Sequence, residues 1–133
     1  FDMLGWIFGT TKKNIVHLHE HDRASGYIEL ERANVRWFLS INEDVLPKEV
    51  VEKNQRTYRS ITVEGEELEF SGGFTDLHTE SYKQIINGNG YGIEDARQAI
   101  ETVYTIRNAK PIGLKGEFHP FAQKKLSKHP FAR

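Results

Sequence analysis

The sequence contains no cysteine, and its positive and negative charges almost cancel. The absence of cysteine excludes disulfides, thiolate nucleophiles and cysteine-ligated zinc. Lys and Arg number 18 against 19 Asp and Glu, and the net charge of -1 provides no general attraction to nucleic acid or an anionic membrane. No segment approaches the ~18 consecutive apolar residues of a membrane span, and no basic region followed by an apolar one opens the chain. We therefore expect a soluble protein with neither nucleic acid nor membrane as partner.

Large apolar side chains are nevertheless present in sufficient number for a packed core. The 133 residues include 8 Phe, 5 Tyr and 2 Trp, and 38% of the chain is hydrophobic. This length corresponds to one domain of ordinary size. We expect a single hydrophobic core.

Hydrophobic periodicity predicts one helix, then four or five strands, then two helices. Apolar residues in 2–8, closed by Gly9, indicate a short helix, and period-2 patterns indicate strands over 15–21, 27–31 and 33–41. Residues 42–54 are predicted as a loop with one helical turn, and 58–63 and 66–70 as a hairpin turning at Glu64 and Gly65. Helical spacing indicates helices over 74–86 and 94–107. This order predicts an α+β domain with a mostly antiparallel open sheet and helices on one face.

Two segments outside this pattern have distinctive composition. Residues 88–92 are rich in glycine, but they follow a helix and lack the G-x-G-x-x-G spacing, which argues against a phosphate-binding turn. Residues 111–133 form a basic tail with four lysines that repeats His-Pro-Phe-Ala at 119–122 and 129–132. An offset of ten residues is too short for a solenoid repeat.

Three histidines alternate along the first predicted strand. His17, His19 and His21 would project from one side of it, with Val16 and Leu18 on the other. Two imidazoles at this spacing can reach one metal ion, but a third ligand is not evident. We favour a polar strand face and predict no metal site.

His78 and Arg36 are the strongest candidates for binding residues. His78 falls on the apolar side of its predicted helix, where an imidazole needs a hydrogen-bond partner, so it is either a buried structural residue or part of a site. With Thr75 and Tyr82 it forms a polar stripe suited to sugar hydroxyls. Arg36 could grip a carboxylate or diphosphate, although a cross-strand ion pair with Glu29 or Glu31 is the favoured interpretation.

No catalytic constellation is evident in the sequence. No Ser, His and Asp occur in a convincing order, and paired carboxylates fall on predicted turns, strand faces and helix starts. From the residues alone, we expect a binding or association domain.

Three stretches carry a resemblance to a known family. Residues 25–41, 59–65 and 69–79 closely resemble the C-terminal domain of nucleotide-sugar dehydrogenases in the Gfo/Idh/MocA oxidoreductase family, particularly its UDP-N-acetyl-2-amino-2-deoxyglucuronate 3-dehydrogenases. The resemblance extends from Phe1 to about Arg107 and leaves the tail outside.

The resemblance implies an NAD-dependent enzyme with two domains. Residues 1–110 would be its substrate-binding and oligomerisation domain, and residues 111–133 would be a basic tail. An N-terminal Rossmann domain, which this sequence does not include, would hold NAD. The family's catalytic lysine and histidine would both lie outside this sequence, because the chain begins within the family's His-Phe-Phe-Asp-Met-Leu motif. We therefore expect the chain alone to be inert, with no catalytic, cofactor-binding or metal-binding residue.

The resemblance also implies a substrate, a pathway and a partner. The complete enzyme would oxidise C3 of a UDP-N-acetyl-aminosugar uronic acid during lipopolysaccharide (O-antigen) biosynthesis in the cytoplasm. The family places a substrate-facing residue four positions after a Phe, and Phe74 puts His78 there; Thr75 and Arg36 are further candidates. Alternatives are another sugar or polyol dehydrogenase of the family and a non-catalytic association module.

A homo-oligomer, dimer or tetramer, is expected through the open sheet. Its predicted apolar side offers more surface than two helices readily cover. The residues concerned are Val35, Trp37, Leu39, Ile41, Ile61 and Val63.

Overall fold

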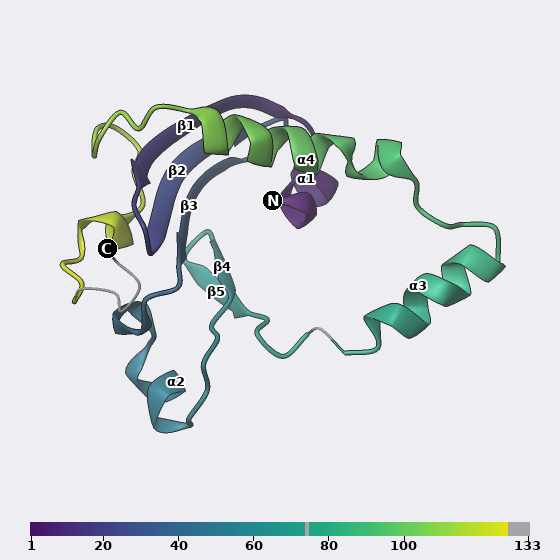
Figure 1. The fold of residues 1–133 in the computed structure, drawn as a ribbon, viewed down its shortest axis with the longest axis horizontal. Coiled ribbons are helices and arrows are strands. Elements are labelled where there is room, and N and C mark those ends of the chain that lie inside the picture. The colour runs from purple at the N-terminus through teal and green to yellow at the C-terminus, as the bar shows by residue number, and fades with distance from the viewer. Residues whose placement is uncertain (74, 128–133) are drawn as a thin grey trace. The chain divides into compact units, whose positions relative to one another are not determined.

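Helices and strands form close to the positions that the sequence predicts. The computed structural model describes residues 1–73 and 75–127. In chain order its elements are α1 (Asp2–Phe8), β1 (Thr11–His19), β2 (Arg23–Leu30), β3 (Asn34–Ser40), the 3-10 turn η1 (Glu43–Val45), α2 (Lys48–Glu52), β4 (Ser60–Val63), β5 (Glu66–Glu69), α3 (Leu77–Ile86), α4 (Ile93–Asn108) and the 3-10 turn η2 (Pro120–Gln123) (Figure 1). The chain divides into two units: the first comprises Phe1–Asn42 and Gly92–Arg133, and the second Glu43–Tyr91.

An antiparallel sheet of three strands forms the centre of the first unit. The strands follow the order β1-β2-β3, and Gly26 lies opposite both Val16 and Trp37. A Cβ atom at Gly26 would lie 2.3 Å from the carbonyl oxygen of Ile15 and 2.6 Å from the Trp37 ring, so the strands can approach this closely only because residue 26 is glycine. The predicted α+β class with antiparallel sheets is confirmed.

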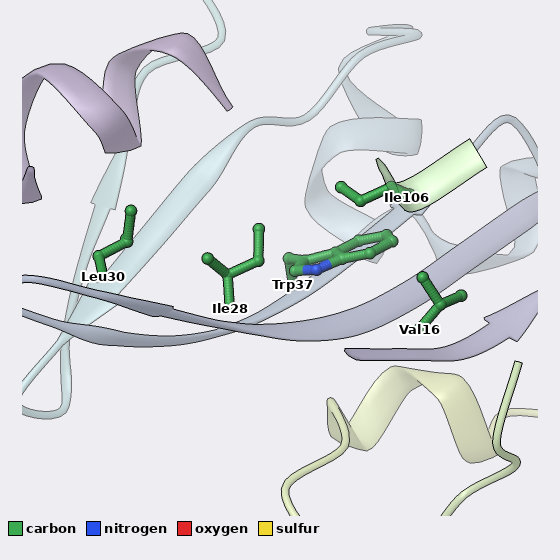
Figure 2. Close-up of a cluster of buried hydrophobic side chains, with 5 residues drawn as sticks. All are labelled: Val16, Ile28, Leu30, Trp37 and Ile106. Carbon is green, nitrogen blue, oxygen red and sulfur yellow. The ribbon is translucent and has the colours of Figure 1, made fainter. Parts of the chain in front are cut away.

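The hydrophobic core lies on one face of this sheet, under α4 and α1. Figure 2 shows Leu30, Ile28, Trp37 and Val16 pointing from the strands to the side where Ile106 of α4 lies. The Phe1 ring meets Trp37 edge-on, with ring centroids 5.3 Å apart. Because Trp37 is buried inside the chain, its assignment to an intersubunit surface is wrong, whereas Leu39 and Ile41 of the same predicted surface are exposed.

The C-terminal segment covers part of the opposite face. Phe38 of β3 lies on this side, and its ring stacks on His119 and meets Phe121 edge-on. Ala122, in the same segment, is buried. We call residues 117–127 the strap, because they pack on the sheet although the sequence predicts a tail outside the domain.

The predicted alternation of histidines along β1 is wrong because the strand contains a β-bulge. Val16 lies opposite Gly26 whereas Leu18 lies opposite Ser25, so His17 is the extra residue and the alternation of faces shifts there. Val16 and Leu18 therefore point to opposite faces, contrary to the sequence prediction. His17 is buried against Phe118 of the strap, and its ring centroid lies 6.3 Å from that ring.

The second unit consists of short elements with few buried side chains. β4 and β5 form the predicted hairpin, and Glu64 and Gly65 both have positive φ, 52° and 88°, as a tight two-residue turn requires. The predicted loop at 42–54 contains η1 and α2. Among residues 43–91, position 74 excepted, Val50 is the only one that is fully buried.

No helix in the part of the chain that the structure describes is long and apolar enough to span a membrane.

Candidate functional site

The structure places the three predicted site residues in different units. Arg36 belongs to β3 in the first unit, whereas Thr75 and His78 belong to the second. The three are therefore not brought together within either unit.

Arg36 lies at the edge of the strap-covered face, and its side chain is 52% exposed. Its guanidinium lies 3.9 Å from the carboxylate of Glu117, so its ion-pair partner belongs to the strap and not to β2. The predicted pairing with Glu29 or Glu31 is thus replaced by this contact. Glu31 instead accepts a hydrogen bond from the Thr10 hydroxyl, which lowers the pKa of the Glu31 carboxyl. An exposed, loosely paired guanidinium remains available to an anionic ligand.

His78 is exposed in the first turn of α3. The helix begins after Asp76, whose φ of 57° turns the chain sharply into it. Its neighbours Leu77 and Tyr82 are also exposed, and Phe74 lies outside the described residues. The argument that His78 needs a partner because it is buried is therefore wrong for this chain. The interpretation as a buried structural histidine fails for the same reason.

Thr75 is exposed immediately before α3 and lies in no helix or strand. Its role in binding stays a prediction.

A hollow of about 190 Å³ between α1 and α4 was not anticipated from the sequence. Within its wall, the hydroxyls of Thr11 and Thr102 lie 3.2 Å apart. Gln98, also in the wall, donates a hydrogen bond to the carbonyl oxygen of Gly9. These contacts join positions about 90 residues apart in the chain, so no local motif could indicate them. The hollow is lined by Phe1, Asp2, Gly5, Trp6, Thr11, Asp95, Gln98, Ala99 and Thr102.

The glycine-rich segment before α4 does not suit a dinucleotide. It connects one helix to another, and the first turn of α4 carries Glu94 and Asp95. The Asp95 carboxylate accepts a hydrogen bond from the Gly92 amide at 2.7 Å and so occupies the position where a pyrophosphate would bind. The residues at this helix start therefore do not fit NAD.

The described residues contain no group of three or more His, Asp or Glu side chains that could hold a metal ion.

Comparison with solved structures reveals a close likeness over almost the whole chain. The WlbA (WbpB) dehydrogenase from Thermus thermophilus, in a complex with NAD and alpha-ketoglutarate, matches 90% of this chain at 45% identity with a TM-score of 0.84. The same dehydrogenase in a complex with NAD and UDP-GlcNAcA matches 90% at 42% identity with a TM-score of 0.83. No family model matches the chain.

The match covers only part of the length of those dehydrogenases. The chain spans 39% of the length of the dehydrogenase chains. The matched 90% is longer than the predicted region 1–107, so part of the segment after Arg107 belongs to the match as well. The chain is thus similar to one part of the WlbA (WbpB) dehydrogenases, which confirms the resemblance to UDP-sugar dehydrogenases predicted from the sequence.

Proposed function

We propose that this chain is part of an NAD-dependent oxidoreductase that oxidises C3 of a UDP-N-acetyl-aminosugar uronic acid. The observation that carries the proposal is the 42–45% identity over 90% of the chain to a dehydrogenase crystallised with NAD and UDP-GlcNAcA. The pathway would be lipopolysaccharide (O-antigen) biosynthesis, and the location the cytoplasm. The fold would be that of a Gfo/Idh/MocA C-terminal domain, with residues 1–110 binding substrate and residues 111–133 forming a basic segment that includes the strap.

Exposed apolar residues on three helices support a role as one part of a larger enzyme. On α3, nearly every large apolar side chain faces solvent, and α1 and α4 also carry exposed ones. Isolated domains seldom expose so many large apolar side chains, whereas surfaces that bury against another domain do. These residues are Met3, Trp6, Ile7, Leu77, Tyr82, Ile85, Ile86, Ile93, Ile100, Val103 and Tyr104.

The chain's own contribution would be substrate binding and subunit association. NAD would be held by another part of the enzyme, because the glycine-rich segment here does not fit it. His78, Thr75 and Arg36 remain our candidates for contacts to the sugar nucleotide, and Leu39 and Ile41 our candidates for contacts to a second subunit. Exposure of all three polar side chains is compatible with such contacts.

A direct assay tests the activity. The natural protein that carries this chain should reduce NAD when supplied with UDP-N-acetylglucosaminuronic acid, and a panel of free sugars and polyols should be turned over far more slowly. Activity on a sugar or polyol without the UDP group would favour the alternative substrate class. Absence of any NAD reduction, with light scattering still showing assembly, would favour the association module.

A substitution tests the role of His78 within that enzyme. We expect His78→Ala to lower turnover of the UDP-sugar acid and to leave NAD affinity and thermal stability almost unchanged, because the side chain is exposed and the cofactor binds elsewhere. Thr79→Ala, at the next and equally exposed position, is the matched control. Normal kinetics for both variants would remove His78 from the site.

A further inference from the structure

The strap that covers the sheet face is built around one histidine with an unusual set of contacts. The His119 ring stacks on Phe38 with centroids 5.6 Å apart and meets Phe121 edge-on at 5.2 Å. Its Nδ1 accepts a hydrogen bond from the Phe121 amide at 3.1 Å, and this contact caps η2. His119 therefore holds the strap both by its ring and by its unprotonated nitrogen.

Protonation of Nδ1 would remove this cap. A protonated nitrogen has no lone pair and cannot accept from the Phe121 amide, so the side-chain cap of η2 would be lost. The backbone bond from the Ala122 amide to the His119 carbonyl oxygen would remain, but the Phe121 amide would need another partner, which weakens the turn that buries Ala122.

The charges around His119 oppose a second positive charge. Arg36 on β3, Arg23 on β2 and Lys124 on the strap are cations on this side of the sheet, and the Lys124 ammonium lies 3.7 Å from the centre of the Phe121 ring. Glu117 is the nearby anion, but it is engaged with Arg36 at 3.9 Å. Burial, followed by the charge of Arg36, lowers the pKa of His119.

A second imidazole lies under the same strap. His17 of β1 is only 2% exposed and packs against Phe118, and its Nδ1 has no hydrogen-bond partner within the described residues. Any experiment on His119 must separate it from His17.

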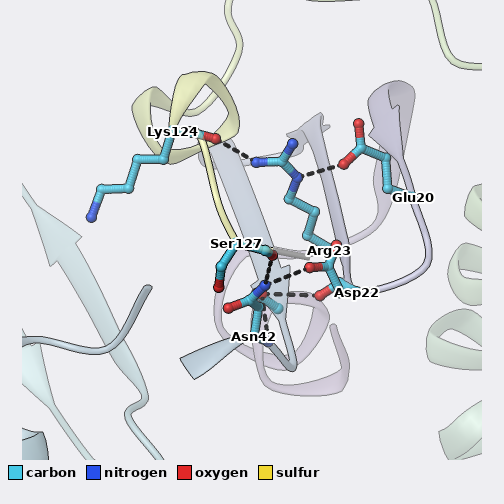
Figure 3. A network of polar contacts seen from close by, with 7 residues as sticks. Glu20, Asp22, Arg23, Asn42, Lys124 and Ser127 are labelled. Atoms are coloured by element: carbon cyan, nitrogen blue, oxygen red, sulfur yellow. Dashed lines mark hydrogen bonds and ion pairs between the residues drawn. The ribbon is translucent and has the colours of Figure 1, made fainter. Parts of the chain in front are cut away.

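Hydrogen bonds to main-chain carbonyl oxygens anchor the far end of the strap. Arg23 donates a hydrogen bond to the carbonyl oxygen of Lys124 at 2.6 Å, and Asn42 donates one to that of Ser127 at 3.0 Å (Figure 3). Asp22 and Glu20 orient these two donors by accepting hydrogen bonds from them. These contacts hold the far end of the strap, whereas its first half packs on the sheet through His119 and through the contact of Phe118 with His17.

We propose that His119 is a pH-sensitive latch, which holds the strap on the sheet while its imidazole is neutral and releases the η2 turn from Phe38 when the imidazole is protonated. The strap docks better when the imidazole is neutral. Docking is therefore strongest above the pKa of the free imidazole, about 6.5. It weakens as the pH falls from that value towards the lower pKa of the docked imidazole. Release uncovers Phe38 and His17 on the sheet.

Nuclear magnetic resonance of the full chain tests the latch between pH 8 and pH 5, above the range in which carboxylates protonate. The buried methyl group of Ala122 reports docking, since its signal changes when release exposes it to solvent. In the unaltered chain we expect the ratio of docked to released strap to fall by at most about tenfold per pH unit, the limit for one proton.

His119→Asn is the decisive variant. An Asn side chain at this position can accept from the Phe121 amide but does not titrate, so the strap should stay docked across the range. His129→Asn, at the same place in the second His-Pro-Phe-Ala motif, is the matched control and should keep the transition. His119→Ala should release η2 at every pH.

Three results would overturn the proposal. The first is an Ala122 signal that does not change with pH in the unaltered chain. The second is a transition that persists in His119→Asn. The third is a transition that disappears in His17→Gln although His119 is unaltered, which would assign it to the buried histidine.

Discussion

The two units of this chain have similar secondary structure but differ sharply in what they bury. The first packs Val16, Ile28, Leu30 and Trp37 of the sheet against Ile106 of α4, and its other face carries the strap. The second contains a hairpin and two helices, yet Val50 is its one fully buried residue within the described positions of 43–91. Local sequence is sufficient to form helices and turns, whereas a core requires partner surfaces. The large apolar side chains of α3 accordingly stay exposed, because the second unit offers them no such partner surface.

A pair of isoleucines provides the largest expected contrast between the units. Ile28 is 1% exposed and Ile86 is 83% exposed. Ile28→Ala should lower the free energy of unfolding by about 2–5 kcal/mol, because it leaves a cavity in the core. Ile86→Ala should change it by less than about 0.5 kcal/mol. Urea unfolding measures both, and equal effects would contradict the difference in packing.

A pair of glycines tests whether the two units also differ in how closely other atoms pack against the backbone. Gly26→Ala would force a methyl group against the Ile15 carbonyl and the Trp37 ring, and should cost about 1–3 kcal/mol of unfolding free energy. Gly72→Ala has open space around it and should be nearly neutral. Thermal unfolding of the two variants compares them, and a stable Gly26→Ala chain would show that β1 and β3 can separate around β2.

The smallest expected contrast between the units concerns the pKa values of two carboxylates, Glu31 in the first unit and Glu67 in the second. The Thr10 hydroxyl is the main cause of the lowered pKa of Glu31, whereas Ser60 contributes more than Tyr58 to the lowered pKa of Glu67. Thr10→Val should therefore remove the main cause and raise the Glu31 pKa, and Tyr58→Phe should remove only the lesser of the two hydrogen bonds that lower the Glu67 pKa. Both carboxylates have lowered pKa values in the folded chain, so any stability that they add is present above the unfolded pKa and declines as the pH falls through the folded one. Carboxyl carbon resonances followed against pH provide the measurement, and a full return of Glu67 after Tyr58→Phe would contradict the order of causes.

The elements were largely predictable because their signals are local. Alternation in 33–41 predicted β3, helical spacing predicted α3 and α4, and Glu64 with Gly65 predicted the hairpin turn. The resemblance to UDP-sugar dehydrogenases also came from contiguous stretches of sequence. The faces of β1 were not predictable, since the bulge at His17 depends on pairing with β2.

The candidate site was less predictable than the fold. His78 occupies an apolar stripe of its helix, and that pattern alone suggested that its side chain is buried. The side chain is exposed because nothing in its own unit covers that stripe. Arg36 was expected to pair across the sheet, but the strap brings Glu117 to it from 81 positions away in the chain.

The sequence by itself determined the class of fold, the order of the elements and the kind of enzyme that the chain resembles, because periodicity, turn residues and sequence identity are all recorded along the chain. Only the tertiary structure decided which face of the sheet forms the core, that Trp37 is buried within the chain, and that the His-Pro-Phe-Ala segment at 119–122 docks on Phe38. These outcomes depend on contacts between residues far apart in sequence, and the free energy of such contacts exists only once the elements have packed.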